Sequence, residues 1–145
     1  DAFEDDVSGK ISFNVGKAME NAVSLDMRYP VTFDEVEVVD KIQTLATSLH
    51  LEVERMSGLD GLYVPTDSDL VEKLMESYIE VSGDTLAKPL KIGGATYARS
   101  MDNVVAFGPL FPGKPMVAHQ ANEYIEIEDL KKAIEIYMIA FEKLC

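Results

Sequence analysis

Two alternating segments near the N-terminus constrain the fold more than any other feature of the sequence. Ile11, Phe13 and Val15 alternate with polar residues, which is the pattern of a strand with one buried face. Residues 22–30 repeat this pattern and put Arg28 on the side opposite the apolar residues. Because the residues between the two segments are few and polar, we expect an antiparallel hairpin.

The residues after the hairpin predict a helix over about 33–49. Thr32 and Glu35 have the spacing of a capping box. The helix would carry one apolar stripe, formed by Val36, Val39, Ile42, Leu45, Ala46 and Leu49. Residues 50–56 alternate again and predict a third strand. Strand, strand, helix and strand resemble half or more of a ferredoxin-like sandwich, with the helix packed on one face of the sheet.

The second half has a different pattern, which predicts a boundary near Pro65. Thr66 and Asp69 have capping spacing before a helix that Gly83 can end in a left-handed conformation. Three short strands are expected after it, over residues 86–94, 103–108 and 116–119. A last helix from about 127 would use the stripe Leu130, Ala133, Ile134, Tyr137, Phe141 and Leu144. This half therefore resembles part of an α/β layer with too few strands, and the whole chain is predicted to be α+β.

Composition limits the classes of partner. A net charge of -13 would repel nucleic acid and anionic lipid, so neither is expected to bind. The sequence has no apolar run that approaches 18 residues and shows no export signal, and its one cysteine, Cys145, cannot form an internal disulfide. We therefore expect a cytoplasmic protein.

Four places in the sequence could carry chemistry, and each also has an ordinary structural interpretation. The loop "FGPLFPG", residues 107–113, could shape the rim of a pocket, but as a plain loop it needs no function. His119 follows a short apolar run, but one histidine is not a zinc site, because zinc requires three or four protein ligands. The pair Gly93 and Gly94, with Thr96 and Arg99, could cradle a carboxylate, although most glycine-rich turns are only turns. Arg28 could bind a carboxylate in bidentate fashion, or be a solvated arginine or a partner of Asp26.

Taken in order, four segments resemble one protein family. The segments "GKISFNVG", "LDMRYP", "GGATYARSMDNVVAFGPLFPG" and "HQANEYIEIEDL" are similar to the C-terminal portion of the PepV-like dinuclear zinc dipeptidases, relatives of succinyl-diaminopimelate desuccinylase and carnosinase. The resemblance implies that residues 1–65 are the second part of a ferredoxin-like lid domain. It also implies that residues 66–145 are the C-terminal segment of the α/β catalytic domain.

The resemblance also implies a function and roles for individual residues. The parent protein would be a zinc metallopeptidase with two zinc ions, which hydrolyses dipeptides by means of a metal-activated water. His119 would be a metal ligand, with Glu123 a candidate for orienting it. Arg28, Gly94, Thr96 and Arg99 would bind substrate. No catalytic residue is expected in this chain, because the general base and the other metal ligands lie upstream in such enzymes.

We therefore expect the chain to be a fragment that is inactive by itself. Its missing strands would leave an exposed sheet, which would favour binding of the remainder of the parent chain or self-association. The alternative is a free-standing ferredoxin-like module that binds a ligand or a partner without catalysis. The sequence does not rank dipeptide substrates or separate a dipeptidase from a desuccinylase or an aminoacylase with certainty.

Overall fold

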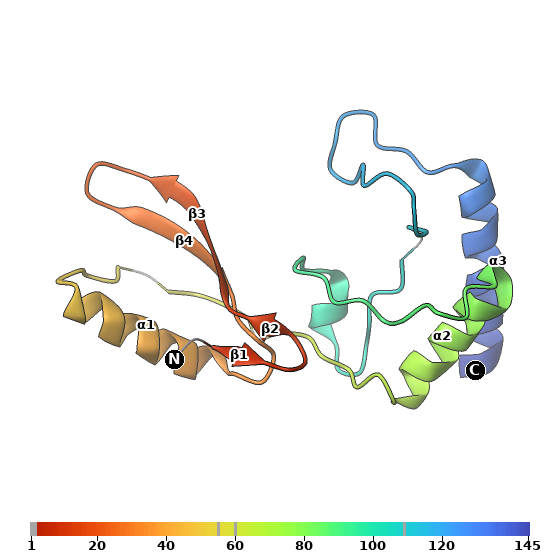
Figure 1. Cartoon of the computed structure of the whole chain (residues 1–145), viewed down its shortest axis with the longest axis horizontal. Coiled ribbons are helices and arrows are strands. Elements are labelled where there is room, and N and C mark those ends of the chain that lie inside the picture. The colour runs from red at the N-terminus through yellow and green to blue at the C-terminus, as the bar shows by residue number, and fades with distance from the viewer. Residues whose placement is uncertain (1–2, 55, 60, 109) are drawn as a thin grey trace. The chain divides into compact units, whose positions relative to one another are not determined.

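We describe a computed structural model, which covers residues 3–54, 56–59, 61–108 and 110–145. Within these ranges the chain forms three α-helices and two small antiparallel sheets, which confirms the predicted α+β class (Figure 1). The chain divides into two compact units, Asp1–Tyr63 with Lys91–Ala95, and Val64–Leu90 with Thr96–Cys145. None of the helices in the ranges above has both the length and the apolar character that crossing a membrane requires.

The predicted hairpin is present in the first unit. It consists of β3 (Ser12–Ala18) and β4 (Val23–Arg28), which pair in antiparallel register (Figure 1). Ser12 pairs with Arg28, and Asn14 pairs with Asp26, so these four residues share the polar face. The side chain of Arg28 therefore stands on the face that the alternation predicted, at the end of β4.

The apolar face of the hairpin is exposed, which contradicts the predicted packing of a helix on the sheet. Phe13, Val15 and Leu25 are 53%, 60% and 44% exposed. Among the described residues, α1 (Glu35–Ser48) makes no close backbone contact with either strand. A physical reason is that a two-stranded ribbon is narrow, and sheets generally need a third strand to form a stable packing face.

The third strand predicted over residues 50–56 is also wrong for the part of this segment that the structure describes, which leaves out Arg55. The helix α1 ends in a turn at His50, whose φ is 56°. The backbone N–H of Leu51 then donates back to the carbonyl of Ala46 at 2.9 Å. Alternation alone cannot make a strand, because the backbone must also find a neighbouring strand with which to pair.

The helix α1 lies within the predicted range of 33–49 but begins at a different cap. The side chain of Asp34 accepts the backbone N–H of Glu37 at 2.8 Å, so Asp34 is the N-cap residue. The predicted capping box of Thr32 and Glu35 is therefore wrong. The hydroxyl of Thr32 instead donates to the carboxylate of Asp5 at 2.9 Å.

Asp5 organises the start of the chain, where two short strands escaped prediction. These are β1 (Glu4–Asp5) and β2 (Gly9–Lys10), which pair in antiparallel register. The carboxylate of Asp5 accepts hydrogen bonds from the backbone and hydroxyl of Ser8 and from Thr32. Burial opposes ionisation, but the hydrogen bonds from Ser8 and Thr32 outweigh it and lower the pKa of Asp5 below its ordinary value.

Asp5→Asn is expected to loosen this N-terminal anchor. An amide oxygen accepts more weakly than a carboxylate, and the Ser8 hydroxyl, which accepts the backbone N–H of Val31 at 2.9 Å, would lose its orientation. We expect faster hydrogen exchange at the amides of Gly9 and Val31 at pH 7, with exposed Asp6→Asn as the control that removes the same charge.

The pH dependence of this effect has a defined sign. Because the pKa of Asp5 is lowered in the folded state, its stabilisation is present above the unfolded value of about 3.9 and is lost as the pH falls through the folded value. Wild type and Asp5→Asn should therefore converge in acid. Equal protection of the two proteins at pH 7 would contradict this role of Asp5.

The second unit is built on two helices that pack side by side. They are α2 (Asp69–Ser82), capped at its start by Ser68 rather than by the predicted Thr66, and α3 (Ile127–Leu144) (Figure 1). As predicted, Gly83 ends α2 in the left-handed conformation, with a φ of 72°. Small residues among those buried on the two helices permit close packing. The buried residues include Val71, Leu74, Ser77, Ala133, Ile136 and Ala140.

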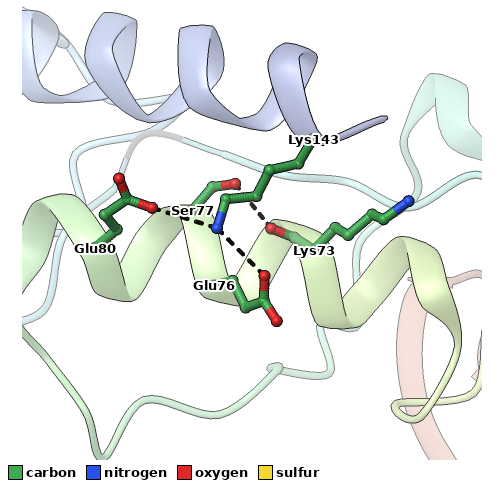
Figure 2. Close-up of polar contacts among 5 residues, drawn as sticks. All are labelled: Lys73, Glu76, Ser77, Glu80 and Lys143. Atoms are coloured by element: carbon green, nitrogen blue, oxygen red, sulfur yellow. Dashed lines mark hydrogen bonds and ion pairs between the residues drawn. The ribbon is translucent and has the colours of Figure 1, made fainter. Parts of the chain in front are cut away.

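Polar contacts join the same two helices near the end of α3. The ammonium group of Lys143 lies 3.2 Å from Glu76 and 3.2 Å from Glu80, both on α2 (Figure 2). The fully buried hydroxyl of Ser77 donates to the carbonyl of Lys73 at 2.7 Å within α2 (Figure 2). The pair of helices is therefore held by a packed centre with ion pairs at its edge.

The buried face of α3 differs from the predicted stripe. Ala133 is buried as expected, but Leu130, Ile134 and Phe141 are exposed, and Ile136 and Ala140 take the buried positions. A similar division holds in α1, where Val38 is buried but the predicted Val36, Leu45 and Leu49 are exposed. Both helices thus keep an apolar side that the described part of this chain does not cover.

The three short strands predicted between α2 and α3 are absent from the described residues. The described residues between α2 and α3 instead form turns, segments without regular secondary structure and one 3-10 helix, η1 (Tyr97–Ser100). An apolar segment becomes a strand only when its backbone groups pair with a neighbour. The described chain supplies no such neighbour in its second unit, and Pro109, within the predicted loop, lies outside the described residues.

Candidate functional site

His119 lies in an exposed turn of the second unit, and its φ is 63°. Its backbone N–H donates to the carboxylate of Glu123 at 3.1 Å. The side-chain amide of Gln120 donates to the carbonyl of Met116 at 2.8 Å, and Asn122 also has a positive φ, of 62°. Glu123 thus shapes the backbone of this turn, and its predicted action on the imidazole of His119 stays a prediction.

The ends of the segment that carries His119 are joined by one lysine. The ammonium group of Lys114 lies 2.6 Å from the carboxylate of Glu126 and 3.0 Å from that of Asp129. Hydrogen bonds to Glu126 and then to Asp129 raise the pKa of Lys114 above its ordinary value. Sequence analysis missed this contact, because Asp129 near the start of a helix is equally well explained as a complement to the helix dipole.

Aromatic contacts fix the segment that leads to Lys114. The hydroxyl of Tyr137 on α3 donates to the carbonyl of Phe107 at 3.0 Å, and the two rings meet edge to face at 5.8 Å. Phe111 stacks on Tyr78 of α2, with the ring centroids 6.3 Å apart. The chain is therefore docked on both helices shortly before it enters the turn of His119.

In the first unit, the structure brings Arg28 next to the pair of glycines. A Cβ atom added to Gly93 would lie 2.9 Å from the Arg28 guanidinium, so the absence of a side chain lets the guanidinium lie against the Gly93 backbone. The ammonium group of Lys91 donates to the carbonyl of Ser8 at 2.8 Å and holds this segment on the same unit. A Cβ atom added to Gly94 would meet nothing within 4 Å among the residues that the structure describes.

The other predicted substrate residues have evident local roles. The hydroxyl of Thr96 accepts the backbone N–H of Ala98 at 3.2 Å and caps η1. Arg99 lies within η1, is half-buried and has an interaction partner. Thr96, Arg99 and His119 belong to the second unit, whereas Arg28 and Gly94 belong to the first.

The described residues do not form a complete metal site. Over residues 3–54, 56–59, 61–108 and 110–145, no group of three histidine, cysteine, aspartate or glutamate side chains comes together in a way that could hold a metal ion. His119 can offer one imidazole, whereas zinc takes three or four protein ligands. No step of a reaction can therefore be derived through a metal held by this chain alone.

Comparison with known proteins gives a consistent match along the chain. A family model described as peptidase family M20/M25/M40 matches residues 4–143. The Bacillus subtilis (strain 168) protein named "Putative dipeptidase YtjP" is 37% identical in an alignment 146 residues long, which covers 97% of this chain and 31% of that protein. The Staphylococcus saprophyticus protein named "Putative dipeptidase SSP1012" is 33% identical in an alignment 148 residues long, which covers 99% of this chain and 31% of that protein. The chain thus spans about a third of the length of these curated relatives.

Proposed function

We propose, from the premise that this chain belongs to peptidase family M20/M25/M40, that it is part of a zinc-dependent dipeptidase. The observation that carries the proposal is the family match over residues 4–143, together with relatives that are named as dipeptidases. Because the chain spans 31% of those relatives, we propose that the remainder of a longer chain supplies most of the active site.

The two halves of the chain would have different tasks in that enzyme. Residues 1–65 would be the second part of a lid domain, and residues 66–145 the C-terminal segment of the catalytic domain. The exposed apolar sides of the hairpin, α1 and α3 support this incomplete state, because soluble proteins rarely leave large apolar patches uncovered. The remainder of the parent chain would cover them.

Arg28 is proposed to bind the free carboxylate of the dipeptide. A planar guanidinium can donate two parallel hydrogen bonds to a carboxylate, which a lysine cannot reproduce. The open space at Gly94 would let the substrate approach the backbone closely. Thr96 and Arg99 are proposed as further substrate contacts.

His119 is proposed to be the one metal ligand that this chain contributes. A histidine that binds a metal does so as the neutral imidazole. His119 lies in an exposed turn, where a metal held by residues from elsewhere could reach it. Two zinc ions would supply a water that is nucleophilic at neutral pH. The general base is expected outside this chain, so the isolated chain should be inactive.

The proposed function is tested with the full-length gene product. We expect it to hydrolyse unblocked dipeptides, to lose this activity after treatment with a chelator and to regain it with zinc. A dipeptide with an amidated C-terminus should be a poor substrate, because it lacks the negative charge that Arg28 would bind. Dipeptide hydrolysis that persists after complete metal removal would reject the metal-dependent mechanism. Absence of any hydrolysis in the zinc-loaded protein would favour the binding module instead.

A further inference from the structure

We propose that Lys114 is a positioning residue, which holds the turn of His119 in place for metal binding. This inference rests on the proposed role of His119. It concerns a residue that neither the sequence pattern nor the resemblance pointed to. The geometry of one ammonium group and two carboxylates carries it.

Lys114 joins the two ends of the segment that carries His119. Lys114 precedes this segment and Glu126 follows it, and their charged groups lie 2.6 Å apart. The same ammonium group reaches Asp129 in the first turn of α3, at 3.0 Å. One side chain therefore closes the loop and also ties it to a helix.

The hydrogen bonds described within the turn are local. The bonds from His119 to Glu123 and from Gln120 to Met116 join residues four positions apart. Such bonds define the shape of a turn, but they do not fix it to the rest of the unit. Asp129 can supply that fixed point, because it is 7% exposed and lies on a helix that is packed against α2.

The contact differs from an ordinary surface ion pair. Nearby, Lys131 pairs with Glu128 at 2.7 Å, but the two side chains are 66% and 75% exposed. The side chain of Lys114 is 31% exposed and that of Asp129 only 10%, so solvent screens their interaction less. Lys114 also contacts two carboxylates at once, which pairs its charge and restricts the direction of its side chain.

The test compares three variants of the full-length protein: Lys114→Ala, Lys114→Arg and Lys131→Ala. Lys131→Ala is the matched control. It removes the same charge, but from the exposed ion pair between Lys131 and Glu128. Zinc affinity is measured by competition with a chromophoric chelator, and the midpoint of urea unfolding is measured in parallel. Groups that orient a metal ligand typically contribute about 10- to 100-fold in affinity. We expect a loss of that size in Lys114→Ala, near wild-type affinity in Lys131→Ala and recovery of most of the affinity in Lys114→Arg.

Several results would overturn the proposal. Wild-type zinc affinity in Lys114→Ala, with affinity lost in His119→Ala, would reject the role of Lys114 and leave the proposed function standing. An equal loss in Lys114→Ala and Lys114→Arg would show that the charged bridge is not the cause. A loss that is matched by a lower unfolding midpoint would reduce Lys114 to a purely structural residue. Wild-type affinity in both Lys114→Ala and His119→Ala would reject the function proposed for His119 itself.

Discussion

His119→Ala is expected to abolish dipeptide hydrolysis by the full-length protein while its fold stays largely intact. The described contacts of His119 run through its backbone N–H, which alanine keeps, and the residue is exposed. Losing a metal ligand should cost more than losing a group that orients one, which typically costs about 10- to 100-fold. We therefore expect kcat/KM for dipeptides to fall by more than about 100-fold.

The other histidine provides a matched control for this substitution. His50 is also exposed and also has a positive φ, of 56° against 63° for His119, so alanine should strain the backbone similarly at both positions. His50→Ala should retain wild-type kcat/KM. Near wild-type turnover in His119→Ala would remove His119 from the site, and equal losses in both variants would point to a nonspecific effect on folding.

Arg28→Ala is expected to produce the second large effect, on recognition of the substrate carboxylate. Hydrogen bonds to charged groups contribute about 1.5–3 kcal/mol each, so the loss of even one of the two should lower kcat/KM for unblocked dipeptides by about 10- to 150-fold. Arg28→Lys should recover little, because an ammonium group lacks the planar pair of donors. Slow hydrolysis of a C-terminally amidated dipeptide should be unaffected. An equal loss with the amidated and the unblocked substrate would contradict a role in binding the carboxylate.

Gly93→Ala should reproduce part of this effect while residue 28 remains an arginine. The added Cβ would lie 2.9 Å from the guanidinium, which stands at the end of a flexible side chain and can move away. The protein should therefore remain folded while its arginine is displaced. Gly108→Ala is the control, because a Cβ there meets nothing within 4 Å in the described part of the chain. Unchanged KM in Gly93→Ala would indicate that the contact with Gly93 does not position Arg28.

Elements with strong local patterns could be predicted from the sequence. The hairpin and the three helices follow from periodicity, and Gly83 ends α2 as its conformational freedom suggests. The residue that caps the start of α1 could not be chosen from the sequence, because Thr32 and Asp34 can both cap a helix. The choice is understandable only in three dimensions, where Asp5 engages Thr32 and leaves Asp34 to cap the helix.

Contacts between distant residues could not be predicted in this way. Thr32 donates a hydrogen bond to Asp5, which lies 27 positions earlier, and the local sequence around neither residue predicts this contact. The bridge from Lys114 to Asp129 has the same character. The three strands expected between α2 and α3 failed for a different reason, since a strand depends on the neighbour with which it pairs. In the candidate site, the sequence pointed to Arg28 and the glycine pair, but not to their contact.

The most direct test of the central claim is the zinc content of the purified full-length protein, measured per polypeptide for wild type and for His119→Ala. We predict two zinc ions in the wild type and fewer than two in the variant, with His50→Ala unchanged. Two tightly bound ions in His119→Ala, or none in the wild type after growth and purification with zinc, would contradict the claim.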